Sequence, residues 1–215
     1  MVLEALVISL PERKANVQAI RAQLEPYGVK VTELEAFDAR IPANLQKEEA
    51  KLVATQFFQI NKPRSQHSQA ATPGAIGVFL SYRRAWTRIA AMSRPCLVLE
   101  DDFELNESLG SDVIRQYLDQ SVSLLEQETF DCICMTGNLG VARKAVESKR
   151  GIVRMISPFG NGAGIMYSPR GARILLEELP FCLGHADLLI GFVAYKLALA
   201  KEKFVVGMTI DTVAA

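Results

Sequence analysis

Apolar and polar residues along the chain form short strand-like runs that alternate with longer helix-like stretches. Residues 2–10 are an almost continuous apolar run and predict a buried strand. In residues 12–27, apolar side chains recur every three or four positions, as on the buried face of a helix. Gly28 stands where a helix C-cap is expected, and residues 29–37 predict a second strand. A strand, a helix and a strand in this order favour two parallel neighbouring strands joined by a right-handed crossover.

The same two periodicities continue to the end of the chain. Further helices are predicted at residues 48–60, 75–92, 108–126, 169–179 and 186–200. Further strands are predicted at residues 96–99, 130–136, 152–156, 162–167 and 204–210. Polar composition indicates a connection at residues 137–149 and a mobile loop at residues 61–72. The alternation predicts one α/β domain over residues 1–215, with three layers, a mostly parallel sheet and a mobile insertion or lid at residues 38–72.

Composition narrows the classes of protein to which the chain can belong. Apolar residues make up 49% of the 215 residues, and the 24 basic and 24 acidic residues cancel, so no strongly basic footprint for nucleic acid exists. Cys96, Cys132 and Cys134 lie in strand-like runs and form no C-x-x-C pair with one another or with Cys182, which favours buried free thiols in a reducing compartment. The opening segment lacks a basic signal-peptide region, and no apolar run approaches the length of a membrane span. A soluble protein in the cytoplasm is therefore expected.

Three acids follow a buried strand at Leu97-Val98-Leu99-Glu100-Asp101-Asp102. Adjacent carboxylates repel one another, and a divalent cation offsets that cost because Mg²⁺ and Mn²⁺ prefer carboxylate oxygens. Residues two apart on a strand point the same way, so we expect Glu100 and Asp102 to share one cation and Asp101 to face the other side. Ligands bind beyond the carboxyl ends of strands in open α/β sheets, where this cluster lies. A solvated turn, in which Asp102 caps a helix, is the alternative.

The acidic cluster follows a second recognisable segment. Residues 74–86 read GAIGVFLSYRRAW and lead, after ten more residues, into LVLEDD. This order resembles glycosyltransferase family 25 (lipooligosaccharide biosynthesis), in which a Gly-x-Ile-Gly-x-x-x-Ser-His-x-x-x-Trp helix precedes a Leu-Glu-Asp-Asp strand. Tyr82 stands where that family usually has His. Four further segments are similar to the family pattern, in the same order along the chain: residues 7–13, 35–40, 162–172 and 185–187.

The resemblance implies a fold, a reaction and a set of partners. The fold is the nucleotide-diphospho-sugar fold called GT-A. The reaction is an inverting transfer of a hexose, usually galactose, from a UDP-sugar to a lipooligosaccharide or other glycan acceptor. Glu100, Asp101 and Asp102 match a Glu-Asp-Asp version of the DxD motif, with Mn²⁺ or Mg²⁺ held by Glu100 and Asp102. A lipid-linked glycan acceptor would bring at most peripheral contact with the inner membrane.

The resemblance also assigns donor-binding positions along the chain. These are Ser9, Arg13, Asp38, Ser81 and Asp101. Arg13 follows the first strand, where it would contact the nucleotide or be a solvated arginine at a helix start. Asp38 would read the base or ribose, or act as a turn residue. Asp101 would touch ribose or sugar hydroxyls.

An inverting transfer needs a general base near the acceptor hydroxyl. Asp187 matches the family's late Asp and is our candidate, with a role as helix N-cap as the alternative. His185 is a second candidate for base or metal ligand, and Asp211 a weaker candidate for the metal shell.

Two other function classes remain open. Tyr82 and the short stretch after the last predicted strand motivate the first, a nucleotide-binding module of the same fold that has lost transfer activity. The second is a metal-dependent phosphohydrolase, which is disfavoured because no nucleophile motif accompanies the acids.

Overall fold

The computed structural model describes most of the chain. The described residues are 2–47, 49–50, 72–135, 145–149, 152–155, 163–182, 186–200, 203–209 and 213. Within them, no helix is long and apolar enough to cross a membrane.

Eight strands form one mixed sheet. In chain order they are β1 (Leu3–Ser9), β2 (Val29–Glu35), β3 (Cys96–Glu100), β4 (Cys132–Cys134), β5 (Ala145–Lys149), β6 (Ile152–Met155), β7 (Gly164–Tyr167) and β8 (Val206–Thr209). Their order across the sheet is β2-β1-β3-β7-β4-β8-β6-β5. Strands β6 and β7 pair antiparallel with their neighbours, and all the other strands run in one direction. The sheet is therefore mostly parallel in strand direction, as predicted.

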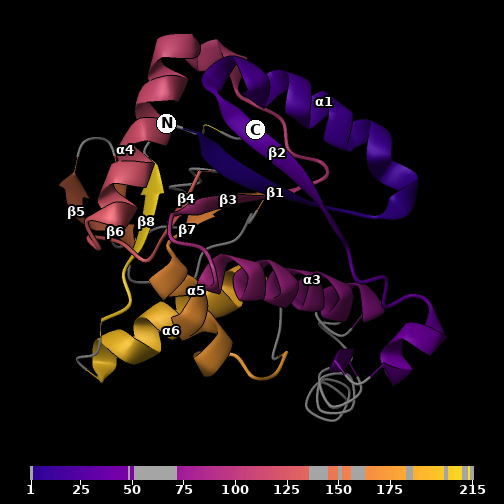
Figure 1. Cartoon of the computed structure of the whole chain (residues 1–215). Helices are drawn as coiled ribbons and strands as arrows, with labels where there is room; N and C mark the ends of the chain where they lie inside the picture. Colours follow the sequence, from indigo (N-terminus) through magenta and orange to yellow (C-terminus); the bar gives the residue numbers. More distant parts are fainter. Residues whose placement is uncertain are drawn as a thin grey trace.

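Helices cover both faces of this sheet (Figure 1). The described residues form five α-helices: α1 (Lys14–Leu24), α3 (Pro73–Ala90), α4 (Ser111–Glu126), α5 (Pro169–Glu178) and α6 (Ala186–Leu199). Successive side chains of a strand point to opposite faces, so Ala5 and Val7 join one core cluster with α1 and α4, while Leu6 and Ile8 join another with α3, α5 and α6. Two cores on opposite faces confirm the three-layer prediction.

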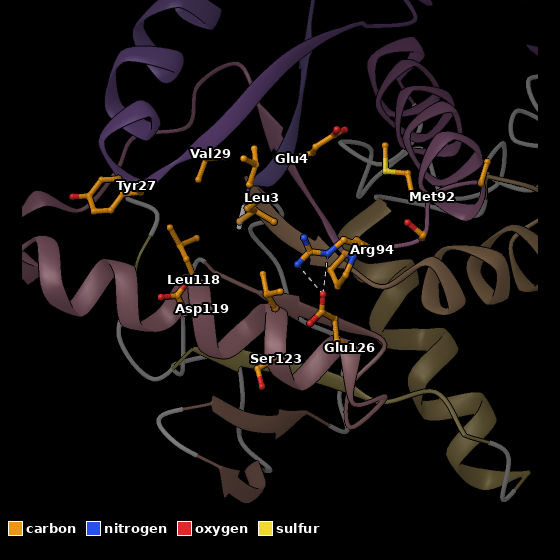
Figure 2. A pocket seen from close by; sticks show the side chains of 15 residues that line it. Leu3, Glu4, Tyr27, Val29, Met92, Arg94, Leu118, Asp119, Ser123 and Glu126 are labelled. Carbon is orange, nitrogen blue, oxygen red and sulfur yellow. Dashed lines mark hydrogen bonds and ion pairs between the residues drawn. The ribbon is translucent and has the colours of Figure 1, made fainter.

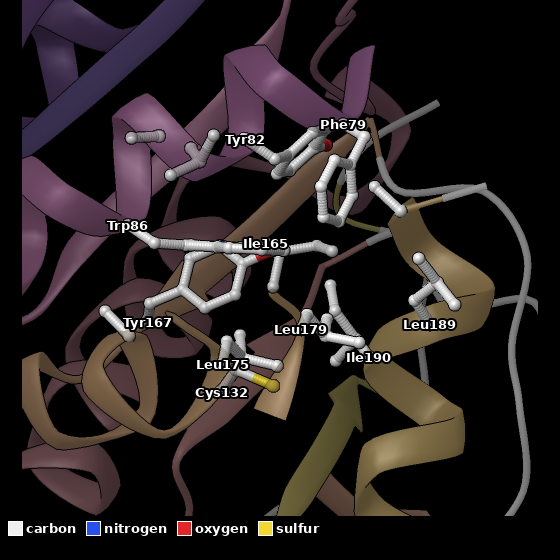
Figure 3. Close-up of a cluster of buried hydrophobic side chains, with 14 of the residues drawn as sticks. Phe79, Tyr82, Trp86, Cys132, Ile165, Tyr167, Leu175, Leu179, Leu189 and Ile190 are labelled. Atoms are coloured by element: carbon white, nitrogen blue, oxygen red, sulfur yellow. The ribbon is translucent and has the colours of Figure 1, made fainter. Parts of the chain in front are cut away.

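An aromatic group anchors α3 to the sheet (Figure 3). Trp86 is fully buried, with ring centroids 6.3 Å from Phe79, 6.0 Å from Tyr82 and 6.3 Å from Tyr167 of β7. The helix begins at Pro73, and the hydroxyl of Thr72 accepts the N–H of Ala75 at 3.3 Å as an N-cap. Trp86 of the motif therefore belongs to the hydrophobic core.

Most predicted elements are present, with ends that differ by a few residues. The predicted first helix consists of α1 flanked by two short 3₁₀ helices, Pro11–Arg13 and Glu25–Tyr27. Gly28 ends it with a φ of 72°, as its predicted capping role requires. All four cysteines are buried and free, as predicted.

One predicted connection is wrong in part, and two expectations fall largely outside the described residues. Residues 137–149 were expected to be a polar connection, but β5 occupies their last part. Its polar sequence, AVESK, lacks a strand-like apolar alternation because β5 lies at the edge of the sheet. The predicted helix at residues 48–60 is described only at residues 49–50, which are helical, and the predicted loop at 61–72 only at residue 72.

Candidate functional site

Three parallel strands end side by side at one edge of the sheet, which we call the carboxyl edge. Strand β1 pairs with β2 and with β3, and Ile8 lies opposite Glu100 at the end of both strands. A hollow of about 250 Å³ opens there, between these strand ends, the segment after β2 and the first turns of α3. Four residues predicted from the sequence line it: Asp38, Ser81, Glu100 and Asp101.

Close packing of α3 against the segment after β2 shapes one wall of the hollow. A Cβ atom at Gly77 would lie 2.6 Å from the carbonyl oxygen of Phe37, so only glycine permits this approach. One turn later, the hydroxyl of Ser81 accepts the N–H of Phe37 at 2.8 Å and donates to the carbonyl of Gly77 at 2.7 Å. Gly77 and Ser81 lie one helical turn apart in the motif, so both contact the segment after β2: the glycine allows the close approach, and the serine hydroxyl accepts the N–H of Phe37.

Two predicted donor-binding serines lie inside the wall. Ser81 is 1% exposed, and its hydroxyl is engaged with the main chain as described above. Ser9, at the end of β1, is fully buried and donates to the carbonyl of Leu10 at 3.2 Å. Ser81 is among the residues that line the hollow and Ser9 is not, and direct contact with a donor remains a prediction for both.

Glu100 is the central acid of the site. The hydroxyl of Tyr82 donates to Glu100 Oε1 at 3.0 Å, from a side chain that is 2% exposed. Burial raises the pKa of the Glu100 carboxyl, the Tyr82 hydrogen bond opposes this, and the charges of Asp102, Asp187 and Asp101 raise the pKa further. A partly buried carboxylate with three acidic neighbours is the electrostatic setting that a cation relieves.

The acids after Glu100 lie in a turn and do not continue the strand. The N–H of Phe103 donates to the carbonyl of Glu100 at 3.1 Å, which closes this turn. Strand alternation therefore ends at Glu100, and the geometric reason given for pairing Glu100 with Asp102 does not apply. Asp102 is exposed. Of the three acids whose charges raise the pKa of Glu100, Asp102 has the largest effect, so the two carboxyls are nonetheless neighbours.

Asp101 faces the first helix, and its predicted contact with ribose or sugar hydroxyls remains a prediction. Its carboxylate accepts a hydrogen bond from Arg13 at 3.0 Å, and its main-chain carbonyl accepts one from Asn16 at 3.0 Å. The Arg13 side chain is 52% exposed while that of Asp101 is 15% exposed. The pair thus fixes the start of α1 against the end of β3 and leaves a cationic group at the border of the site.

Asp38 is paired with a residue that the sequence did not single out. The Arg40 guanidinium donates to both carboxylate oxygens of Asp38 at 2.8 Å and to Glu12 at 3.1 Å. The hydrogen bond from Arg40 is the largest cause of the lowered pKa of Asp38. Arg40 also lines the hollow. Its only sequence signal was its position two residues after Asp38.

Asp187 comes to the same place from a distant part of the chain. It lies in the first turn of α6, where its carboxylate accepts the N–H of Leu188 at 2.7 Å. Its charge also raises the pKa of both Glu100 and Tyr82, so it is near the acids of β3. Asp187 therefore both accepts a hydrogen bond at the start of α6 and lies near the candidate site. His185 and Asp211 lie outside the described residues.

The basic residues of α3 make structural contacts. Arg84 pairs with Glu49 at 2.6 Å and lies over the Phe37 ring, while Arg83 donates to the carbonyl of Leu179. These contacts fit the interpretation of a solvated or packed helix face better than that of a phosphate site.

The carboxylate oxygens at this site suit a metal cation that is also bound by the phosphate oxygens of a nucleotide. The described part of the chain contains no group of three or more His, Cys, Asp or Glu side chains that could hold a metal ion. Magnesium-like cations in nucleotide sites are bound by one or two carboxylates together with phosphate oxygens and water. Glu100 and Asp102 provide two hard oxygen ligands at the carboxyl edge, which fits such a shared site and not a closed protein-only one.

A larger hollow lies at the opposite, amino edge of the same strands (Figure 2). Its volume is about 700 Å³, and its walls include Tyr27, Leu118 and Asp119. The Arg94–Glu126 ion pair, at 2.9 Å, is part of its lining. It contains none of the predicted site residues, and ligands of open α/β sheets bind at the other ends of the strands. The smaller hollow is therefore the better candidate for the functional site.

The fold and site define an α/β protein whose acidic centre lies beyond the carboxyl ends of its strands, a position typical of enzymes that bind nucleotides. The family model described as glycosyltransferase family 25 (LPS biosynthesis protein) matches residues 2–182. The chain belongs to this family, as the motif resemblance predicted, and the membership supports glycosyl transfer in LPS biosynthesis as its activity. Comparison with curated proteins gave no match.

Proposed function

We propose that the protein is an inverting glycosyltransferase of GT-A type that moves a hexose, with galactose as first candidate, from a UDP-sugar to a lipooligosaccharide or other glycan acceptor. The observation that carries the proposal is the acidic centre at the carboxyl edge, where Glu100 lines the hollow and the charges of Asp102 and Asp187 raise its pKa. Family membership supports the transferase class. The donor, the stereochemistry and the acceptor are our inference.

Glu100 and Asp102 would hold Mn²⁺ or Mg²⁺ against the diphosphate of the donor. Such a cation supplies positive charge for the leaving diphosphate. Tyr82 holds one oxygen of Glu100 by its hydrogen bond, which leaves the other oxygen of this carboxylate for a ligand. Arg13 and Arg40, whose side chains are 52% and 60% exposed, stand at the border of the site and could orient the nucleotide.

Asp187 would accept the proton of the attacking acceptor hydroxyl. Inversion requires this base on the face opposite the leaving group, so the acids that face the diphosphate cannot also serve. Asp187 is the only one of the three acids that arrives from a helix start and not from the end of β3.

The second candidate is a nucleotide-binding module that has lost transfer activity. Tyr82 favours it, because the hydroxyl that holds Glu100 occupies an oxygen that would otherwise be a cation ligand. In this reading the hollow still binds UDP, but no sugar is transferred.

A panel of UDP-sugars with Mn²⁺ separates the two candidates. Calorimetry measures binding of each donor, and release of free sugar measures slow donor hydrolysis. An active transferase should bind and slowly hydrolyse one donor of the panel in a Mn²⁺-dependent manner. Binding without hydrolysis or transfer to any glycan would support the binding module, and absence of any donor binding, with or without Mn²⁺, would contradict both.

A further inference from the structure

The outer face of α6 carries four large apolar side chains that the fold leaves exposed. Leu188, Phe192, Tyr195 and Leu199 are 44%, 49%, 49% and 68% exposed. Their spacing of four, three and four residues places them on one side of the helix, and we call them the apolar stripe. The opposite side of α6 is buried in the core beneath the sheet. In Figure 1, α6 lies at the outer border of the lower helix layer.

We propose that the apolar stripe docks the protein on the surface of a lipid bilayer and thereby presents the site to a lipid-linked acceptor. The stripe begins at Leu188, next to the candidate base Asp187. A membrane under α6 would therefore lie beside the place where an acceptor hydroxyl must arrive. The docking is inferred from the apolar stripe alone, whereas its link to a lipid-linked acceptor rests on the proposed function.

The size of the stripe favours a lipid surface over a second copy of the chain. Four half-exposed side chains, two of them aromatic, offer a few hundred Å² of apolar surface. A standard protein interface buries about 800 Å² on each partner. A small set of apolar side chains is, by contrast, sufficient to insert into the boundary between headgroups and acyl chains.

Charge and side-chain type along α6 agree with this occupant. After Asp187 the helix contains no acidic residue and a single base, Lys196, whose side chain is 56% exposed while it pairs with Glu178 at 2.5 Å. Nothing on the stripe therefore repels an anionic headgroup. Tyr195 adds an apolar ring with a polar tip, a combination suited to the border between lipid and water.

The length of α6 determines how it would lie. Fourteen residues at 1.5 Å per residue extend about 21 Å, which is less than the hydrocarbon thickness of about 30 Å. One side of the helix is also buried in the protein core. The helix would therefore rest along the membrane surface and not enter it end-on.

Sedimentation with vesicles of phosphatidylethanolamine and phosphatidylglycerol, without nucleotide or metal, tests the docking. The parent protein should sediment with the vesicles. The double variant Phe192→Ser/Leu199→Ser should bind at least about tenfold more weakly, because two apolar anchors are lost. Val2→Ser/Val113→Ser is the matched control, since these exposed valines (62% and 37%) lie outside α6. It should bind like the parent.

Two further measurements make the outcome decisive. UDP calorimetry with Mn²⁺ should give the same affinity for both double variants, which shows that they are folded. Failure of the parent to bind vesicles, or equal losses in both double variants, would overturn the docking while leaving the donor experiments unaffected. Light scattering that shows a dimeric parent and a monomeric Phe192→Ser/Leu199→Ser protein would also overturn it, because the stripe would then join two copies.

Discussion

The two edges of the sheet differ in what they offer a ligand. The amino edge has the larger hollow, about 700 Å³ against about 250 Å³ at the carboxyl edge. Its charged residues include a surface ion pair, Arg94–Glu126, whose partners are 42% and 38% exposed. The carboxyl edge has a partly buried acid, Glu100, whose three acidic neighbours lie in a turn and on a helix distant in the sequence.

This difference shows that volume is a poor guide to function in this protein. Charges of one sign gathered at partial burial destabilise the fold unless a ligand or a proton offsets them. At the amino edge, the Arg94–Glu126 pair is exposed to solvent, where an ion pair contributes little. The carboxyl edge therefore carries the functional hypothesis, and the following experiments challenge it in order of decreasing expected effect.

The change Asp187→Asn should have the largest effect. The amide keeps the shape of the side chain and can still accept the N–H of Leu188, so stability and UDP affinity should stay nearly unchanged. Transfer should fall by roughly two to four orders of magnitude, the usual contribution of a general base. Steady-state kinetics with the best donor provide the measurement. Transfer at the parental rate would show that Asp187 only begins the helix.

The change Asp102→Asn should remove metal-dependent UDP binding, with a loss of affinity on the order of tenfold to a hundredfold. Because Asp102 is exposed, the fold should remain intact. Calorimetry with and without Mn²⁺ measures the effect, and a chelator should reproduce it in the parent. The matched control is Asp119→Asn, an exposed acid at the amino edge. Equal affinities for the two variants would remove the distinction between the edges.

The change Gly77→Ala should destabilise the protein by about 1–3 kcal/mol and weaken UDP binding, because the new methyl group forces α3 away from Phe37. Urea unfolding measures the free energy of unfolding. Gly74→Ala is the control in the same helix, since its Cβ would meet only the Thr72 hydroxyl, at 3.6 Å. If both changes had the same effect, the close approach at Gly77 would not be what shapes the site.

The change Tyr82→Phe should weaken Mn²⁺-supported UDP binding by roughly threefold to tenfold, the worth of one hydrogen bond. The ring stays in the aromatic core, so the effect should come from the freed Glu100 carboxylate. Tyr167→Phe, in the same core, leaves the bond to Glu100 in place and should bind like the parent. An increase in affinity for Tyr82→Phe would mean that the hydroxyl competes with the cation.

The change Arg94→Ala at the amino edge should have the smallest effect. The ion pair with Glu126 is exposed, so its loss should lower the free energy of unfolding by less than about 1 kcal/mol. UDP affinity should stay at the parental value by calorimetry. A large loss of UDP binding would place the nucleotide in the larger hollow and reverse the comparison.

Local signals in the sequence determined the elements and part of the site. Helical spacing, the cap residues Gly28 and Ser168, and the buried apolar runs gave most helices and strands, because these features depend on neighbours within a few residues. The nearly continuous apolar runs of β1 and β3 indicated strands that are buried on both faces. The acids at the end of β3 and the motif of α3 gave the place and class of the site, which family membership confirms for the transferase class.

Tertiary structure decided what depends on distant segments. Strand β7 pairs between β3 and β4, and β5 joins as a polar edge strand, because strand order follows from packing and not from local periodicity. The close contact between α3 and the segment after β2 explains why residue 77 is a glycine. The approach of Asp187 to Glu100, which no spacing in the sequence shows, requires α6 to pack against the core near the end of β3.

Helix α6 shows the difference between what the sequence predicts and what the tertiary structure decides. The sequence of α6 is apolar on every side and predicts only that a helix is present, since such a pattern suits a fully buried helix. The packed structure covers one side and leaves the apolar stripe from Leu188 to Leu199 exposed. A single sequence fixes hydrophobicity residue by residue, whereas burial depends on which other segments arrive to cover each face.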